Sequence, residues 1–379
     1  MHKCVFCLLL FYLCSIFGSY LFCQRNGKDI KVTRSNFIQN LETKLSYYPD
    51  KSYDILINQP ANNALFKYLK KTDYYEISEE ILKSIIDTKP VFFTQAITIK
   101  NKKIKLAFEQ VHIHTSDFHV ATSEGKKLNP DTKQSIFYRG YIIGDDNSWA
   151  TLSICQGKLQ YLIASDEGNF EIYQIKKGKY IGSLSKNDNK THSCLSTPDI
   201  SHTDHILPNH HNSGTRTGNC LQVYMEVDRY TYLQFGDTIA ITSWVNTLFL
   251  NVSTIYAMHD VPLVLSQIYI RNTLPDPYAS LTDIGSVRNQ FVNTLQNNYT
   301  GRIAHLLTTR PLGGGISNGI GGFCNSYPSY PGPQCVSSSL SASNTINQNY
   351  SYNAYVVAHE IGHVMGLRHT QACVWNNTL

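Results

Sequence analysis

The stretch that decides the fold of the C-terminal part of the chain is NAYVVAHEIGHVMGLRH, residues 353–369. Its first two thirds carry apolar residues at helical spacing, which predicts an α-helix. His359 and His363 are four residues apart, so a helix places both imidazoles on one face, one turn from each other. Gly366 permits a positive φ that ends the helix, after which the chain can turn and bring back His369.

These residue types in this pattern predict a catalytic zinc site. Three histidine ligands leave the fourth tetrahedral position of the ion for water, whereas a structural site is closed by four protein ligands. We therefore predict one Zn²⁺ held by His359, His363 and His369. Glu360, beside the first ligand, is placed to act as general base on the water and to pass its proton to a leaving amine.

The N-terminus has the pattern of an export signal. Lys3 precedes an apolar run from Cys4 to Cys23, and polar chain begins at Gln24. We predict that residues 1–23 are a cleaved signal peptide, so that the protein is secreted. The run is also long enough for an uncleaved anchor, which would leave a membrane-tethered protein outside the cell. No second segment is predicted to reach membrane length.

Composition excludes one class of partner. A net charge of +5 is small for 379 residues and is not concentrated in one block, so no nucleic-acid partner is expected. Outside the leader the cysteines form no CxxC pair, which argues against a cysteine zinc cluster. For an exported protein, disulfides are the expectation for most of them: Cys155, Cys194, Cys220, Cys324, Cys335 and Cys373.

Residues 24–190 are predicted to form a β-rich domain with a helical preface near 34–86. Alternating apolar and polar residues, separated by Gly, Asp and Asn, recur in four stretches: 103–115, 135–145, 148–165 and 169–181. Residues 191–219 are rich in Ser, Thr, Asn, His and Pro, and predict an exposed linker or processing region.

From residue 220 onward, strands and helices are predicted to alternate. The expected strands are 221–228, 261–270 and 302–310, and the expected helices are 238–259 and 280–298. This order predicts an α/β (α+β) domain with a mixed, twisted sheet and helices on its faces, including the zinc-binding helix. The domain would span 220–379.

With these motifs in view, the chain resembles the reprolysin (adamalysin, ADAM-type) branch of the metzincin metallopeptidases. The zinc motif with its following cysteine, HEIGHVMGLRHTQAC at 359–373, carries the most specific likeness. FYRGYIIGDDNSWATLSICQGKLQYLI, 137–163, is similar to the propeptide of that branch. The resemblance implies that residues 24–190 are a propeptide and an intramolecular inhibitor, and that residues 220–379 are a metzincin-like catalytic domain acting on polypeptide substrates.

The resemblance also implies two further sites. RIAHLLTTRPLGGGISNGIGGFC, 302–324, is similar to the family's upper edge strand. A substrate peptide would lie antiparallel along Gly315, Ile316, Ser317, Gly319, Ile320 and Gly321; the alternative is a glycine-rich loop. Cys194 occupies the place of a cysteine switch, whose thiolate would block the fourth zinc position, and a disulfide is the alternative.

The prediction is therefore a secreted zinc metalloendopeptidase precursor. A second hypothesis is an inactive or adhesive relic. Metzincins place a methionine-containing turn and a C-terminal subdomain after the third histidine, and nothing after His369 contains methionine. We expect on this ground that the catalytic domain is truncated.

Overall fold

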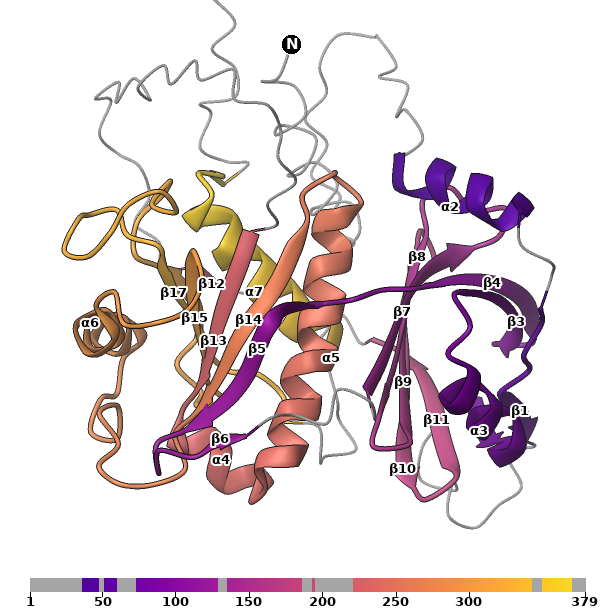
Figure 1. The fold of residues 1–379 in the computed structure, drawn as a ribbon, viewed down its shortest axis with the longest axis horizontal. Coiled ribbons are helices and arrows are strands. Elements are labelled where there is room, and N and C mark those ends of the chain that lie inside the picture. Colours follow the sequence, from indigo (N-terminus) through magenta and orange to yellow (C-terminus); the bar gives the residue numbers. More distant parts are fainter. Residues whose placement is uncertain are drawn as a thin grey trace, which may run out of the picture.

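The computed structural model describes residues 36–47, 51–59, 73–128, 135–185, 193–194, 221–342 and 350–369, with only the main chain for 193–194 and 350. Two β-sheets stand on either side of one long helix, α5 (Thr238–Ala257) (Figure 1). Each sheet has its own hydrophobic core, and the core around α5 contains residues of both halves of the chain.

The first sheet is antiparallel throughout, with the strand order β1-β2-β11-β10-β9-β8-β7-β4-β3. Its hairpins follow from local turn chemistry: Gln156 and Gly157 both have positive φ, 53° and 70°, which suits a tight turn between twisted strands. The strands are β1 (Leu56–Gln59), β2 (Asp73–Ile77), β3 (Phe92–Ile99), β4 (Lys102–Gln110), β7 (Ser135–Ile142), β8 (Trp149–Cys155), β9 (Lys158–Ser165), β10 (Gly168–Lys176) and β11 (Lys179–Leu184).

The predicted strands of this half are confirmed. The helical segment predicted near residues 34–86 is confirmed only in part, because it also contains strands. Two helices, α2 (Asn36–Tyr47) and α3 (Glu79–Thr88), are separated by β1 and β2. Tyr74 and Tyr75 of β2 are both buried, one on each face of the sheet. Aromatic residues buried on both faces stabilise a strand better than a helix, which explains the difference.

The second sheet is mixed, with the order β12-β16-β17-β15-β13-β14-β5-β6. From β17 to β5 the neighbours are parallel, whereas β16 is antiparallel to β17 and β6 to β5. The mixed sheet predicted from residue 220 onward is thus confirmed. The strands are β5 (His114–Thr122), β6 (Lys127–Leu128), β12 (Ser193–Cys194), β13 (Leu221–Val227), β14 (Leu263–Ile270), β15 (Ile303–Leu307), β16 (Gly314–Ser317) and β17 (Gln334–Ser337).

Helices cover both faces of the second sheet. α6 (Ile284–Leu295) packs on one face through four buried apolar residues: Ile284, Val287, Phe291 and Leu295. α5 and α7 (Tyr350–Val364) pack on the other, with the short α4 (Arg229–Phe235) beside the start of α5. By length and apolar composition α5 would suffice to cross a membrane, contrary to the expectation that no second segment reaches that length, but most of it is buried inside this protein.

One connection crosses between the sheets. After β4, which lies next to the edge strand β3 of the first sheet, the chain leaves that sheet and forms β5 and β6 at the edge of the second sheet (Figure 1). It then returns to the first sheet as β7. The pattern at 103–115 predicted extended chain correctly, but residues 114–128 lie in the sheet of the C-terminal half. The proposed boundary at residue 190 therefore does not separate the two sheets.

Candidate metal centre

The helix that carries the motif is held against the second sheet by its apolar face. Ala354, Val357, Ala358 and Ile361 of α7 are completely buried in the core that surrounds α5. Figure 1 shows α7 in yellow, lying between α5 and the β15–β17 side of the sheet. These contacts fix the position of the helix that carries the motif.

The helix ends where the sequence predicts. Gly366 has a φ of 98°, a conformation that residues with a β-carbon avoid. Its N–H donates to the carbonyl of His363 at 2.9 Å, and the N–H of Leu367 donates to the carbonyl of Gly362 at 2.9 Å. This pair of bonds is a Schellman motif, which satisfies two carbonyls at the helix end and reverses the chain toward His369.

The three predicted ligands meet at one point. The Nε2 atoms lie 2.9 Å apart for His359 and His363, 3.1 Å for His363 and His369, and 3.3 Å for His359 and His369. A tetrahedral zinc ion with Zn–N distances of about 2.0–2.1 Å places its nitrogen ligands about 3.3–3.4 Å apart. The triangle of nitrogens therefore fits one zinc ion. Among the described residues, these three histidines form the one group of histidine, cysteine or carboxylate side chains that is close enough together to hold a metal ion.

Hydrogen bonding and burial prepare these nitrogens as ligands. The Nδ1 of His363 lies 2.7 Å from the carbonyl oxygen of Leu367, which can only accept, so Nδ1 carries the proton. The Nε2 of His363 consequently presents a lone pair to the centre of the triangle, as a metal ligand must. Burial lowers the pKa of His369, which favours the neutral imidazole.

Glu360 lies beside this triangle and against the second sheet. Its side chain is fully buried, and it contacts the backbone of Gly315 in β16. A β-carbon on residue 315 would lie 2.4 Å from Oε1 and 2.6 Å from Cδ of Glu360. Only glycine at this position leaves room for the carboxylate.

The predicted substrate strand is shorter than expected. Gly315, Ile316 and Ser317 lie in β16, whereas Gly319, Ile320 and Gly321 lie in a loop. Gly319 and Gly321 have φ values of 87° and 82°, which are incompatible with a strand. The loop instead supports α7, because Gly321 donates its N–H to the carbonyl of His363 at 2.9 Å.

Cys194 belongs to β12, the strand beside β16. β12 pairs in parallel with β16, and Cys194 is the register partner of Gly315, the glycine that contacts Glu360. The main chain of the predicted switch residue thus runs beside the candidate site. Its side chain lies outside the described structure, so the switch stays a prediction.

Two residues that position the site were not predicted, the buried Tyr256 and the half-buried Arg288. Tyr256 of α5 donates from its hydroxyl to the carbonyl of Ala358, the residue before the first ligand, at 2.7 Å. Burial raises the pKa of Tyr256 well above its usual range, so the phenol stays protonated and remains a donor. Arg288 of α6 donates to the carbonyl of Ser317 at 3.1 Å and fixes the end of β16. Both lie in predicted helices, but helical periodicity carries no signal for a contact with another element.

Three cysteines of the described part are free thiols. Cys155 and Cys335 are buried, and Cys324 is exposed. The expectation of disulfides is therefore not met at these three positions. Cys335 lies 3.1 Å from Nδ1 of His305, whose Nε2 is 2.8 Å from the hydroxyl of Ser337, so this thiol belongs to a buried polar cluster.

Comparison with a protein-family model agrees with the geometry. No curated protein matches the sequence. Among solved structures, the chain is similar to metalloproteinase-II from Bacteroides fragilis, with 13% identity and a TM-score of 0.45 over 77% of this chain and 86% of that one. Residues 217–376 match the sequence model of metallopeptidase family M12 (Reprolysin_5), a range that contains all three histidines and Glu360. Residues 217–376 are therefore similar to a metallopeptidase domain, a family that implies a metal, typically zinc, and the three histidines lie in this range.

Proposed function

We propose that this protein is a secreted precursor of a zinc-dependent endopeptidase of the reprolysin-like metzincin type. The observation that carries the proposal is the triangle of Nε2 atoms, 2.9–3.3 Å apart, on a helix whose Glu360 is buried against β16. A peptidase needs a Lewis acid, a proton acceptor and a surface for extended chain, and these residues lie together.

The chain's own residues would divide the work. His359, His363 and His369 hold Zn²⁺, which when bound supplies a water of lowered pKa and an electrophile for the scissile carbonyl. Glu360 would accept a proton from the attacking water at its carboxylate and pass it to the leaving amine. The contact with Gly315 keeps the carboxylate in one place while it does so, and no covalent link to the protein is required.

A polypeptide substrate would bind along β16. One side of this strand is paired with β17, so the other offers main-chain donors and acceptors to an extended peptide running antiparallel. Gly315, Ile316 and Ser317 are the residues that would pair with it. Gly319, Ile320 and Gly321 would contribute indirectly, as part of the loop that supports the end of α7.

The N-terminal part would act as an intramolecular inhibitor. In this structure β12 pairs with the side of β16 that does not contact β17. β12 runs parallel to β16, whereas the proposed substrate would run antiparallel to it. In the precursor, the thiolate of Cys194 would serve as a fourth ligand of the metal. Residues 1–23 would direct export, as a cleaved signal peptide or as an anchor that tethers the protein outside the cell.

The proposal is tested with protein cleaved in the region 195–220, from which β12 has been released. We expect it to hydrolyse a denatured protein substrate, to lose activity with a zinc chelator, and to regain it when zinc is added. Glu360→Ala should retain stoichiometric zinc and lose activity. Activity that survives both chelation and Glu360→Ala would refute the proposal, and zinc binding without any hydrolysis would favour the inactive relic.

The role of Cys194 is tested separately in the uncleaved chain. Cys194→Ser should raise the low activity of the precursor, whereas the matched change Cys155→Ser, at a thiol buried far along the chain, should not. Unchanged latency in Cys194→Ser would exclude the switch and leave the disulfide as the alternative.

A further inference from the structure

The β5–β6 hairpin completes the second sheet with residues of the first half of the chain. β5 is parallel to β14, with Ile268 opposite Val120 and Ile270 opposite Thr122. Main-chain bonds extend the pairing at both ends: Leu265 donates to Ile113 at 2.7 Å, and Ser123 donates to Ile270 at 3.0 Å. Without β5, the main chain of β14 would be an open edge.

Side chains of the hairpin are part of the core of the metallopeptidase domain. Ile113 and Val120 are each 1% exposed, and both belong to the cluster that contains β13, β14, α5 and α7. Phe137 and Trp149 of the first sheet join the same cluster from the other side of α5. An interface built this way resembles a divided domain core more than a contact between separable domains.

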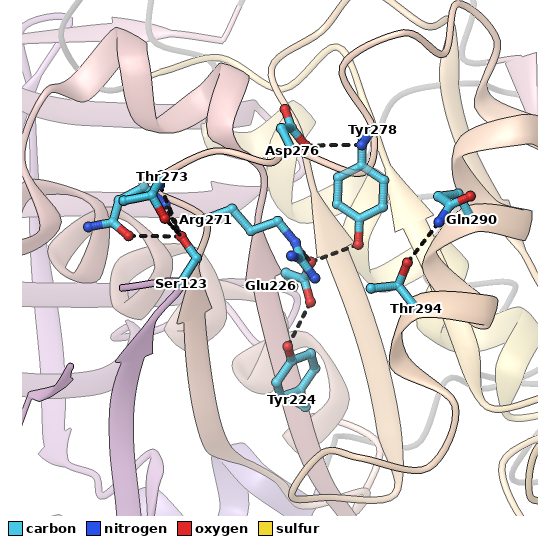
Figure 2. Close-up of polar contacts among 10 residues, drawn as sticks. Ser123, Tyr224, Glu226, Arg271, Thr273, Asp276, Tyr278, Gln290 and Thr294 are labelled. Atoms are coloured by element: carbon cyan, nitrogen blue, oxygen red, sulfur yellow. Dashed lines mark hydrogen bonds and ion pairs between the residues drawn. The ribbon is translucent and has the colours of Figure 1, made fainter. Parts of the chain in front are cut away.

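A loop anchors the end of the hairpin (Figure 2). The hydroxyl oxygen of Ser123 accepts hydrogen bonds from the main-chain N–H groups of Asn272 and Thr273, both at 3.0 Å. The preceding residue, Arg271, pairs with Glu226, which is completely buried. Glu226 is held in turn by the hydroxyls of Tyr224 and Tyr278, each at 2.7 Å. The hairpin therefore docks on a loop that buried charges already fix.

The contact between α5 and the first sheet is different in character. Thr247 and Asn251 lie on one stripe of the helix and bond the hydroxyls of Ser153 and Thr151, at 2.9 and 2.6 Å. Arg139 donates to Thr254 further along the same stripe, at 3.0 Å. Water could replace these polar partners, so this surface orients the two halves, whereas the apolar residues and the β5–β14 pairing hold them together.

The second attachment, at the opposite edge of the same sheet, is much smaller. β12 consists of Ser193 and Cys194, which pair with Gly314 and Gly315 only. Two paired residues give little cooperative stability compared with a nine-residue strand that shares the core. A cut after Cys194 would thus leave β12 easy to displace and the hairpin firmly bound.

We propose that residues 36–185 remain bound to the metallopeptidase domain as a non-covalent subunit after the chain is cut between 195 and 220. Cleavage would free the β16 edge by releasing β12, while β5–β6 continues to complete the sheet. The mature enzyme is then a complex of two chains. The idea that this cleavage activates the enzyme rests on the proposed function. The association of the two fragments after cleavage does not depend on peptidase activity.

The test inserts a site for a sequence-specific protease between residues 195 and 216 of the full chain carrying Glu360→Ala, so that the result does not depend on peptidase activity. After cutting, size-exclusion chromatography is run down to about 1 µM, where a complex with a weaker dissociation constant falls apart. We expect both fragments to elute together, at the volume of the uncut chain. Separate elution under native conditions would overturn the proposal.

A second site between 186 and 192 removes β12 as well, and the remaining fragments should still elute together. Their separation would show that β12, and not the hairpin, is the attachment. Val120→Asn should lower the urea concentration at which the cut fragments separate, relative to Val91→Asn at a half-exposed position of the first half. Equal urea resistance of the two cut variants would also contradict the inference.

Discussion

At the scale of single residues, the candidate site depends on glycines that serve different purposes. Gly315 is needed because Glu360 lies against its α-carbon. Its φ is not positive, so the backbone conformation alone would accept other residues. Gly366 is needed for its positive φ, which turns the chain toward His369. One glycine makes space for a side chain and the other permits a backbone conformation, so alanine at each should have a different effect.

Gly315→Ala should reduce activity far more than stability. The new methyl group would overlap the buried side chain of Glu360, and the proton acceptor would be displaced when the overlap is relieved. A displacement of about 1 Å costs on the order of 100-fold in rate. We expect a loss of kcat of about that size with zinc content unchanged. Gly285→Ala, at the start of α6, is the control, and an equal loss there would contradict the argument.

Gly366→Ala should instead reduce stability and zinc affinity together. A residue with a β-carbon at φ 98° is strained by about 1–2 kcal/mol, and relief of the strain would move the turn that carries His369. Thermal unfolding and zinc titration measure the two effects. Gly366→Asn should lose less, because asparagine tolerates positive φ better than alanine, and the reverse order would be inconsistent with a backbone cause.

At the scale of elements, α7 is positioned by contacts from three directions: the second sheet beneath it, α5 beside it and the loop after β16 at its end. Helical spacing predicted the histidines and the glycine end, because these depend on residues close in sequence. The shorter β16 and the bond from Tyr256 were not predicted. The φ of Gly319 and the partner of Tyr256 depend on the packed structure, which no local pattern encodes.

Tyr256→Phe tests the contact between α5 and α7. The substitution removes one buried hydrogen bond to Ala358, for which about 0.5–1.5 kcal/mol of stability is expected. Because Ala358 precedes His359, we also expect a lower kcat at unchanged zinc content. Urea unfolding and steady-state kinetics provide the readouts. Tyr230→Phe, at an exposed tyrosine of α4, should change neither, and a matching effect there would exclude a specific role for Tyr256.

At the scale of the whole molecule, the two sheets share α5 and the hairpin between them. Alternation at 103–115 and 135–181 identified strands because period-2 patterning is local. It could not show that β5 pairs with β14, because a strand's sequence pattern specifies which face is buried and not which neighbour it joins. Composition changes near residue 190, but this change does not mark a boundary between two cores. The core around α5 contains residues from both sides of it.

Acid should destabilise this shared structure through its buried histidines. Burial lowers the pKa of His305 to about 3 from an ordinary value of 6.5, so the unfolded chain binds a proton at pH 5 that the folded protein does not. The stability contributed by the neutral imidazole is present above pH 6.5 and is lost as the pH falls toward 3. At pH 5 the loss is about 2 kcal/mol for this residue.

Urea unfolding at pH 7.5 and pH 5.0 checks this prediction. His305→Gln cannot titrate, so its stability should depend less on pH than that of the unsubstituted protein, whatever its absolute stability. The metal-binding histidines titrate in both proteins and cancel in the comparison. An identical pH dependence would show that His305 is not held neutral.

The crossing of β5 to the second sheet has a consequence for the order of folding. The ribosome completes β5 at Thr122 long before it reaches Leu263, where β14 begins. During synthesis the hairpin must wait for its partner, and the late pairing closes a long loop, which is slow. Residues 221–369 made alone would have to fold their sheet with the β14 edge unpaired, because β5 belongs to the first half of the chain.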